Sequence, residues 1–145
     1  MFYQPKHFQP EELISKALYD HLDQQGKLYL VPYFFDPRIL ETFDLLRDEF
    51  GPITINNWHN GGNLNQCGFR WKDSDVGAEY SQHRYGRAGD VHASNHPAEE
   101  IRQDLFKNPK KECYKHITCI ELGVSWFHCD VRNYDKINGV LQVTP

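Results

Sequence analysis

Two strand-like runs in the C-terminal third of the chain lie only two residues apart, and this spacing constrains the fold more than any other feature. Residues 116–122 (HITCIEL) and 125–131 (SWFHCDV) flank the dipeptide Gly123-Val124. A two-residue turn whose first residue is glycine favours a type II′ β-hairpin. The sequence therefore predicts an antiparallel sheet that contains this hairpin.

The predicted hairpin register gives the two strands one apolar face and one polar face. Pairing Leu122 with Ser125 places Cys119 opposite His128, and each strand then alternates between the faces. The apolar face carries Ile120, Leu122, Phe127, Cys129 and Val131. The polar face carries Cys119, Glu121, Trp126, His128, Asp130 and Arg132. In this register Glu121 lies diagonal to His128, roughly 7–8 Å away at the backbone, whereas a slip of one residue would separate the two.

Helical patterns precede the hairpin. Asp36 and Pro37 are typical of an N-cap and a first helical residue, apolar residues then recur at helical spacing as far as Phe50, and Gly51-Pro52 ends the pattern. Further helices are predicted over 10–21 and 97–107, and short strands over 52–56 and 140–143. Helices followed by clustered strands indicate one α+β domain over residues 1–145, with a small antiparallel sheet flanked by helices.

Length and composition narrow the possible function classes. A chain of 145 residues fits one domain, and 16 Lys and Arg residues against 20 Asp and Glu residues give a formal net charge of −4. A nucleic-acid-binding protein would present a basic face, so no nucleic-acid partner is expected. No apolar run approaches the roughly 20 residues of a membrane span. The first residues resemble no secretory signal, so the four cysteines are expected to be reduced.

The segment 81–90 (SQHRYGRAGD) carries the residue types of a metal site. His83 and Asp90 offer an imidazole and a carboxylate, which are both ligands for Zn²⁺. The residues between them include Gly86, Ala88 and Gly89. Small residues let the backbone turn tightly and bring the two side chains onto one centre. With His128 from the hairpin as third ligand, the set leaves a fourth position open, which is the arrangement of catalytic zinc.

These two parts of the chain resemble the signatures of a known family. Residues 81–90 match the pattern SxHxxGxAxD of the zinc D-alanyl-D-alanine carboxypeptidases and dipeptidases. Residues 126–132 (WFHCDVR) look like the second signature, which occurs in carboxypeptidase-like enzymes of bacteria and phages. The same layout appears in the zinc-binding signalling domain of Hedgehog proteins. The resemblance implies a fold with a small antiparallel sheet flanked by helices.

The resemblance also implies a cofactor and roles for particular residues. It implies that zinc is held by His83, Asp90 and His128. An acidic residue near the last histidine activates water in the family, and Glu121 looks like its counterpart; the hairpin geometry independently places Glu121 near His128. Asp130 is the alternative for this catalytic role, or it orients His128 from outside the ligand set.

One departure from the family concerns the substrate. Family members commonly carry an SGYRS-like stretch whose arginine holds the C-terminal carboxylate of the substrate, but residues 55–60 (INNWHN) contain no arginine. Arg70, in a long polar loop over 57–80, is a candidate to replace it, since a guanidinium suits a carboxylate. Arg84 and Trp126 are further candidates for substrate binding. Carboxypeptidase and endopeptidase activity therefore both remain open.

The sequence thus predicts a zinc metallopeptidase that hydrolyses peptide bonds of peptidoglycan. Without a secretory signal, such an enzyme is expected to stay in the cytoplasm until release, as in a phage-type enzyme that acts on the cell wall. A first alternative is a Hedgehog-like module that holds zinc and binds a partner without cleaving it. A second alternative is a non-haem Fe(II) oxygenase that uses His128 and Asp130 in its metal site.

Overall fold

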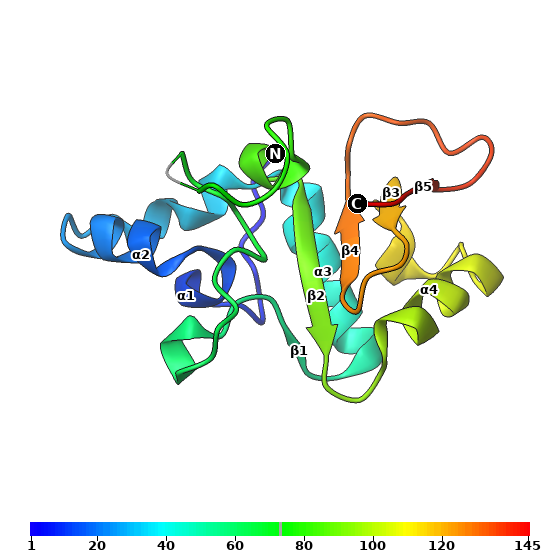
Figure 1. Ribbon diagram of the computed structural model, residues 1–145, viewed down its shortest axis with the longest axis horizontal. Helices are drawn as coiled ribbons and strands as arrows, with labels where there is room; N and C mark the ends of the chain where they lie inside the picture. Colours follow the sequence, from blue (N-terminus) through cyan, green and yellow to red (C-terminus); the bar gives the residue numbers. More distant parts are fainter. Residues whose placement is uncertain (73) are drawn as a thin grey trace.

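A mixed β-sheet forms the centre of the molecule in the computed structural model, which describes residues 1–72 and 74–145 (Figure 1). Its strands in that part of the chain are β1 (Ile53–Thr54), β2 (Ala88–Ala93), β3 (Cys119–Glu121), β4 (Phe127–Asp130) and β5 (Leu141–Val143). They lie in the order β1-β2-β4-β3-β5. The α+β class is confirmed. The expectation of an antiparallel sheet holds for β1 to β4 only.

Strand β5 corrects that expectation, because it runs parallel to β3. Cys119 pairs with Leu141 and Glu121 pairs with Val143. The chain leaves β4, makes a long connection through residues 131–140 and returns along the far side of β3. A short turn would force neighbouring strands to be antiparallel, whereas a connection of this length permits either direction.

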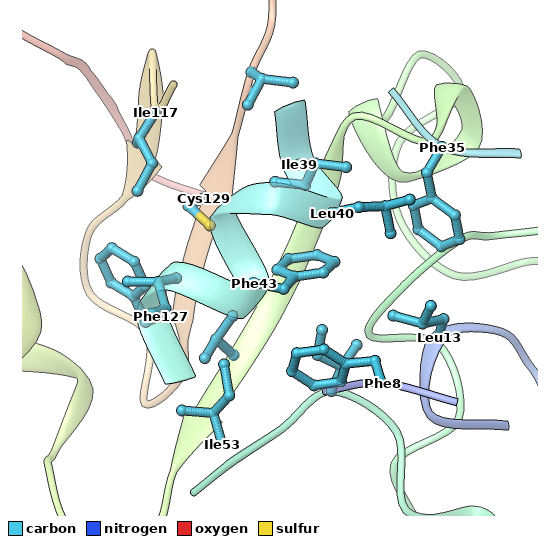
Figure 2. Packing of buried hydrophobic residues seen from close by; sticks show 14 of the residues in the cluster. Phe8, Leu13, Phe35, Ile39, Leu40, Phe43, Ile53, Ile117, Phe127 and Cys129 are labelled. Atoms are coloured by element: carbon cyan, nitrogen blue, oxygen red, sulfur yellow. The ribbon is translucent and has the colours of Figure 1, made fainter. Parts of the chain in front are cut away.

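Helix α3 (Pro37–Phe50) packs on one face of the sheet and builds the core with it. Figure 2 shows Ile39, Leu40 and Phe43 of this helix among the buried side chains, together with Phe127 and Cys129 of β4. The Asp36 side chain accepts a hydrogen bond from the Arg38 amide at the start of the helix, as an N-cap does. The predicted helix from Asp36 to Phe50 is therefore confirmed.

Close contact between α3 and the sheet requires a glycine in β2. A Cβ atom at Gly89 would overlap the ring of Phe43. Helix α4 (Ala98–Lys107) packs against the central strands β2 and β4, and it confirms the helix predicted over 97–107. In the part of the chain that the structure describes, no helix is long and apolar enough to cross a membrane. The four cysteines are free, as expected.

The helix predicted over residues 10–21 is wrong as a single element. The chain forms α1 (Pro10–Leu13) and α2 (Lys16–Asp23), and between them Ile14 is extended. The carbonyl of Ile14 accepts hydrogen bonds from Asn56 Nδ2 at 3.1 Å and Trp58 Nε1 at 2.9 Å. These distant side chains stabilise the break, which helical periodicity alone does not predict.

The predicted hairpin register is also wrong, by two residues. Cys119 pairs with Asp130 rather than with His128, and Ile120 pairs with Cys129. A longer loop through residues 122–126 replaces the two-residue turn. Because the side-chain period of a strand is two, a shift of two residues keeps every side chain on its predicted face.

Buried Arg102 of α4 explains the longer loop. Its guanidinium donates to the carbonyl oxygens of Glu121 at 2.9 Å, Val124 at 2.6 Å and Trp126 at 2.7 Å. Gly123 adopts a positive φ of 74° in the same loop. The Arg102 side chain thus forms hydrogen bonds with three carbonyl groups of the loop, which a two-residue turn would direct elsewhere. Arg102 therefore selects the loop and, with it, the register of the hairpin.

Candidate metal centre

Three buried side-chain atoms that could bind a metal ion come from distant segments of the chain and lie close together. Asp90 Oδ1 lies 3.3 Å from His83 Nε2 and 2.8 Å from His128 Nδ1, and the two nitrogens lie 3.4 Å apart. In a tetrahedral zinc site with bonds of about 2.0–2.1 Å, ligand atoms are separated by roughly 3.3 Å. The three residues predicted from the sequence are brought together, and they could hold a metal ion.

The sheet itself places two of the three ligands. Strands β2 and β4 are antiparallel neighbours, and Asp90 pairs directly with His128. Residues that are directly opposed in a sheet share one face, so the carboxylate and the imidazole point to the same side. The sequence pattern predicts a tight turn between His83 and Asp90 and no strand here. Strand β2 is not visible in the pattern, because Ala88 to Val91 are all buried and show no alternation of polar and apolar residues.

The third ligand, His83, lies in the short 3₁₀-helix Gln82–Tyr85, just before β2. Gly86 ends this helix with a φ of 66°, in the left-handed region that favours glycine. A Cβ atom at this position would also overlap the backbone oxygen of Phe34. Gly86 is therefore what allows the chain to turn from His83 into β2.

Hydrogen bonds on the outer side of each imidazole fix which nitrogen faces the cluster. His83 Nδ1 donates to the carbonyl oxygen of Gly68 at 2.8 Å. His128 Nε2 lies 3.3 Å from Asp130 Oδ2. Histidines that bind metals commonly donate their second N–H to a carbonyl or a carboxylate in this way. His83 Nε2 and His128 Nδ1 are thus left free to act as ligands.

Asp130 occupies the orienting position rather than a position in the cluster. Its side chain is 0% exposed, and it accepts hydrogen bonds from the Arg132 guanidinium at both oxygens. A carboxylate held in this way lies on the far side of His128 from the other ligand atoms. Of the two roles considered for Asp130, the geometry favours orientation of His128 over general-base catalysis. It also disfavours a metal site in which Asp130 is a ligand, as the oxygenase alternative requires.

Glu121 is the acidic residue beside the open side of the cluster. Its Oε2 lies 3.9 Å from His128 Nδ1, and its side chain is 21% exposed. It lines a cavity of about 560 Å³, here called the ligand cavity, which is lined also by His83, Asp90 and His128. The observed register, continued by one residue, places Glu121 directly opposite His128 rather than diagonal to it.

The charges of the cluster depend on one another. Burial would raise the pKa of Asp90, but hydrogen bonds from His128 and His83 and the charges of both rings hold it well below its usual range. Burial would lower the pKa of His128, but hydrogen bonds to Asp130 and Asp90 and the charges of Asp90 and Glu121 raise it to about 9. In the metal-free protein His128 therefore carries a proton near neutral pH, which a metal ion must displace.

The three residues predicted to bind substrate lie in different places. Arg70 and Trp126 line the ligand cavity. Arg70 also contacts the cluster directly, since its Nη2 lies 3.3 Å from Asp90 Oδ2. Arg84 donates to the carbonyl of Ser74 at 2.8 Å and is not among the described residues that line the cavity. The prediction for Arg84 is therefore not supported, because its guanidinium stabilises a loop instead.

Sequence reasoning missed two arginines of this region. Arg132 neutralises Asp130 and lines the ligand cavity. Arg102 positions the backbone of Glu121 and Trp126 from α4. The sequence does contain a signal for Arg102: it lies three residues before Leu105, on the same side of the predicted helix, where a buried charged residue needs partners.

A second cavity adjoins the first. It has a volume of about 380 Å³, is lined by residues 63–67 and His92, and is here called the side cavity. The two cavities share Arg70, Val76, Asp90 and Trp126. Two adjoining cavities therefore lie beside the His-Asp-His cluster, and only the ligand cavity is lined by all three of its residues.

No family model, curated protein or solved structure matches this chain. The assignment of the site therefore rests on its own geometry. That geometry is a buried His-Asp-His cluster with spacings suited to a metal ion, outer hydrogen bonds that fix both imidazoles, and one acidic side chain at the open side.

Proposed function

We propose that the protein is a zinc-dependent peptidase that hydrolyses peptide bonds of peptidoglycan, either as a D-alanyl-D-alanine carboxypeptidase or as a cell-wall endopeptidase. The observation that carries the proposal is the spacing of His83, Asp90 and His128, which suits three ligands of a tetrahedral ion with one position open. Glu121 beside the open position supplies the acid–base group that such a peptidase needs.

Zinc is the metal that fits this donor set best. Two imidazole nitrogens and one carboxylate oxygen are borderline and hard ligands, and three protein ligands are typical of catalytic zinc. Bound zinc supplies a Lewis acid that polarises the scissile carbonyl and lowers the pKa of water to about 7. The fold proposed with this function is the Hedgehog-like arrangement, in which helices precede a metal segment and a metal-bearing hairpin.

Glu121 and three residues that support the site have separate roles in the reaction. Glu121 accepts a proton from the attacking water and delivers it to the amine nitrogen as the C–N bond breaks. Asp130 keeps the His128 ring oriented, and Arg132 neutralises the charge of this buried carboxylate. Arg102 holds the backbone carbonyl of Glu121 and so positions its side chain beside the cluster.

Replacing the proposed base tests this function. Glu121→Gln keeps the size of the side chain but cannot accept the proton, so hydrolysis should fall by a factor of about 10²–10⁴ while one zinc per chain is retained. Mass spectrometry of purified muropeptides measures cleavage, and elemental analysis measures zinc. Glu100→Gln, at an exposed glutamate of α4, is the matched control and should cleave normally.

Three outcomes would contradict the proposal in different ways. Unchanged muropeptide cleavage by Glu121→Gln would remove Glu121 from the mechanism. A wild-type protein that holds zinc but leaves muropeptides intact would favour the alternative of a zinc-binding interaction module. Iron in place of zinc in the purified protein would favour the oxygenase alternative.

A further inference from the structure

The two cavities at the metal cluster give a bound substrate room on both sides of the reacting bond. The ligand cavity contains the three ligand residues and Glu121. The side cavity begins at Asp90 and Trp126, which both cavities share, and extends to Leu64, Gln66 and other residues that do not line the ligand cavity. A peptide whose scissile bond lies at the cluster can therefore continue into either cavity.

Unpartnered polar atoms lie on the side chains that line these cavities. Gln82 lines the ligand cavity, Gln66 lines the side cavity, and each has a buried Oε1 without a hydrogen-bond partner among the described residues. Trp126 lines both, and its buried Nε1 likewise has no partner within the described chain. A buried polar group without a partner destabilises the fold, so such groups call for an explanation. These three atoms have almost no exposed surface, so rotation of their side chains toward the cavities would present two acceptors and one donor to the N–H and C=O groups of an extended peptide.

Both arginines near the cluster are already neutralised by carboxylates of the protein. Arg70 contacts Asp90, donates from Nε to the Gln66 carbonyl at 2.9 Å, and has a side chain only 10% exposed. Arg132 forms its ion pair with Asp130. A carboxypeptidase needs a free cation to hold the terminal carboxylate of its substrate. Among the described residues that line the two cavities, Arg70 and Arg132 are the only arginine or lysine residues, and neither is free.

We infer that the site is an endopeptidase site, which cleaves a bond inside a peptide whose chain occupies both cavities. This inference rests on the proposed peptidase function and chooses between the two activities that the sequence left open. In the reaction, water adds across an internal amide: the carbonyl carbon gains the hydroxyl group and the amide nitrogen gains the proton as the C–N bond breaks. The aliphatic Leu64 and Val76, together with the Trp126 ring, suit the side cavity to an apolar side chain.

Capping the substrate separates the two activities. The probe is a peptidoglycan stem peptide ending in D-alanyl-D-alanine, offered to the zinc-loaded protein with a free or an amidated C-terminus. An endopeptidase should cut both at the same internal bond, with values of kcat/KM within about threefold of each other. Release of the terminal D-alanine from the free peptide, with loss of cleavage on amidation, would overturn the inference but leave the proposed peptidase intact. If neither peptide is cut, the proposed function fails with it.

Filling the side cavity tests its use directly. Leu64→Trp should raise KM for the internal bond about tenfold, because the larger ring occupies the space of the substrate chain, while zinc content stays at one per chain. Ile137→Trp is the matched control, since Ile137 is 84% exposed and lies outside both cavities. A KM unchanged by Leu64→Trp would overturn the inference.

A second variant tests the side cavity even if Leu64→Trp does not fold. Gln66→Leu removes the unpartnered oxygen and keeps the volume of the side chain, so the free energy of unfolding should stay the same or rise. If this oxygen binds substrate, KM should rise about fivefold to tenfold at the same time. Equal KM values for Gln66→Leu and the wild type would contradict a role of the side cavity in peptide binding.

Discussion

His128 Nε2 lies 3.3 Å from Asp130 Oδ2, on the side of the ring opposite the nitrogen that faces His83 and Asp90. Asp130 is 0% exposed and is also bound by Arg132. The pKa of Asp130 is lowered, since hydrogen bonds from His128 and Arg132 outweigh the effect of burial. An ionised carboxylate behind the ring keeps Nε2 protonated and leaves Nδ1 as the ligand atom.

Removing the charge of Asp130 should weaken metal binding without removing a ligand. Asp130→Asn preserves the shape of the side chain but binds the Nε2 proton less strongly, so zinc affinity should fall about 10–100-fold. Competition with a chromophoric chelator measures the affinity. Asp135→Asn changes an exposed aspartate and should bind zinc as the wild type does. Equal affinities in both variants would show that Asp130 does not position His128.

Metal binding should stabilise the fold, because the ligands come from segments far apart in the chain. Zinc at about 1,000 times its dissociation constant adds roughly 4 kcal/mol to the free energy of unfolding, so a chelator should lower the melting temperature. His83→Ala removes one ligand, and its melting temperature should not respond to the chelator. His7→Ala changes an exposed histidine and should keep the full response. A wild type that melts at the same temperature with and without chelator would argue against a metal site.

The stability of the metal-free protein should fall as the pH rises above neutral. The pKa of His128 is about 9 in the folded state and 6.5 in the unfolded state, so its contribution is complete below pH 6.5 and is lost as the pH rises through 9. The free energy of unfolding should decrease by about 2 kcal/mol between pH 6.5 and 8.5. Urea unfolding of the chelated protein at the two pH values measures this decrease.

The His128→Asn variant and the zinc-bound wild type provide two controls for this pH dependence. His128→Asn lacks the titrating group, so its free energy of unfolding should change little over the same range. With zinc bound the dependence should reverse, because zinc binds the neutral imidazole and competes with the proton. A wild type and a His128→Asn variant with parallel pH profiles would contradict the raised pKa of His128.

Arg102 should contribute to stability far more than a surface arginine does. Arg102→Met keeps much of the apolar contact but leaves the carbonyls of Glu121, Val124 and Trp126 without their donor. The free energy of unfolding should fall by about 3–5 kcal/mol, since the half-buried carbonyls lose hydrogen bonds to a charged donor, which contribute about 1.5–3 kcal/mol each. Arg87→Met is the control, because the Arg87 side chain is 45% exposed.

Urea unfolding compares these arginine variants. A loss of less than 1 kcal/mol in Arg102→Met would show that the loop satisfies its carbonyls in another way. The metal ligands lie outside this loop, so Arg102→Met should still bind zinc where it is folded. Peptide hydrolysis should fall more than zinc affinity does, because the backbone of Glu121 loses its support.

The sequence by itself determined the parts of the protein that depend on neighbouring residues. The N-cap at Asp36 and the apolar spacing that follows predicted α3 correctly, because both act within a few helical turns. Strand alternation predicted the faces of Glu121 and His128 despite the wrong register. Residue type alone marked His83, Asp90 and His128 as side chains that could hold a metal ion, which needs no knowledge of the fold.

Only the tertiary structure decided the features that depend on contacts between distant residues. Arg102 sets the hairpin loop, and Trp58 helps to hold Ile14 out of a helix; both act across at least 19 residues of sequence. The direction of β5 and the hydrogen-bond partners of Asp130 and Arg84 likewise depend on contacts that local patterns do not reveal. Periodicity and capping reflect interactions between residues that are close in the sequence. Buried polar groups form hydrogen bonds with partners from any part of the fold, so their contacts cannot be predicted from local patterns.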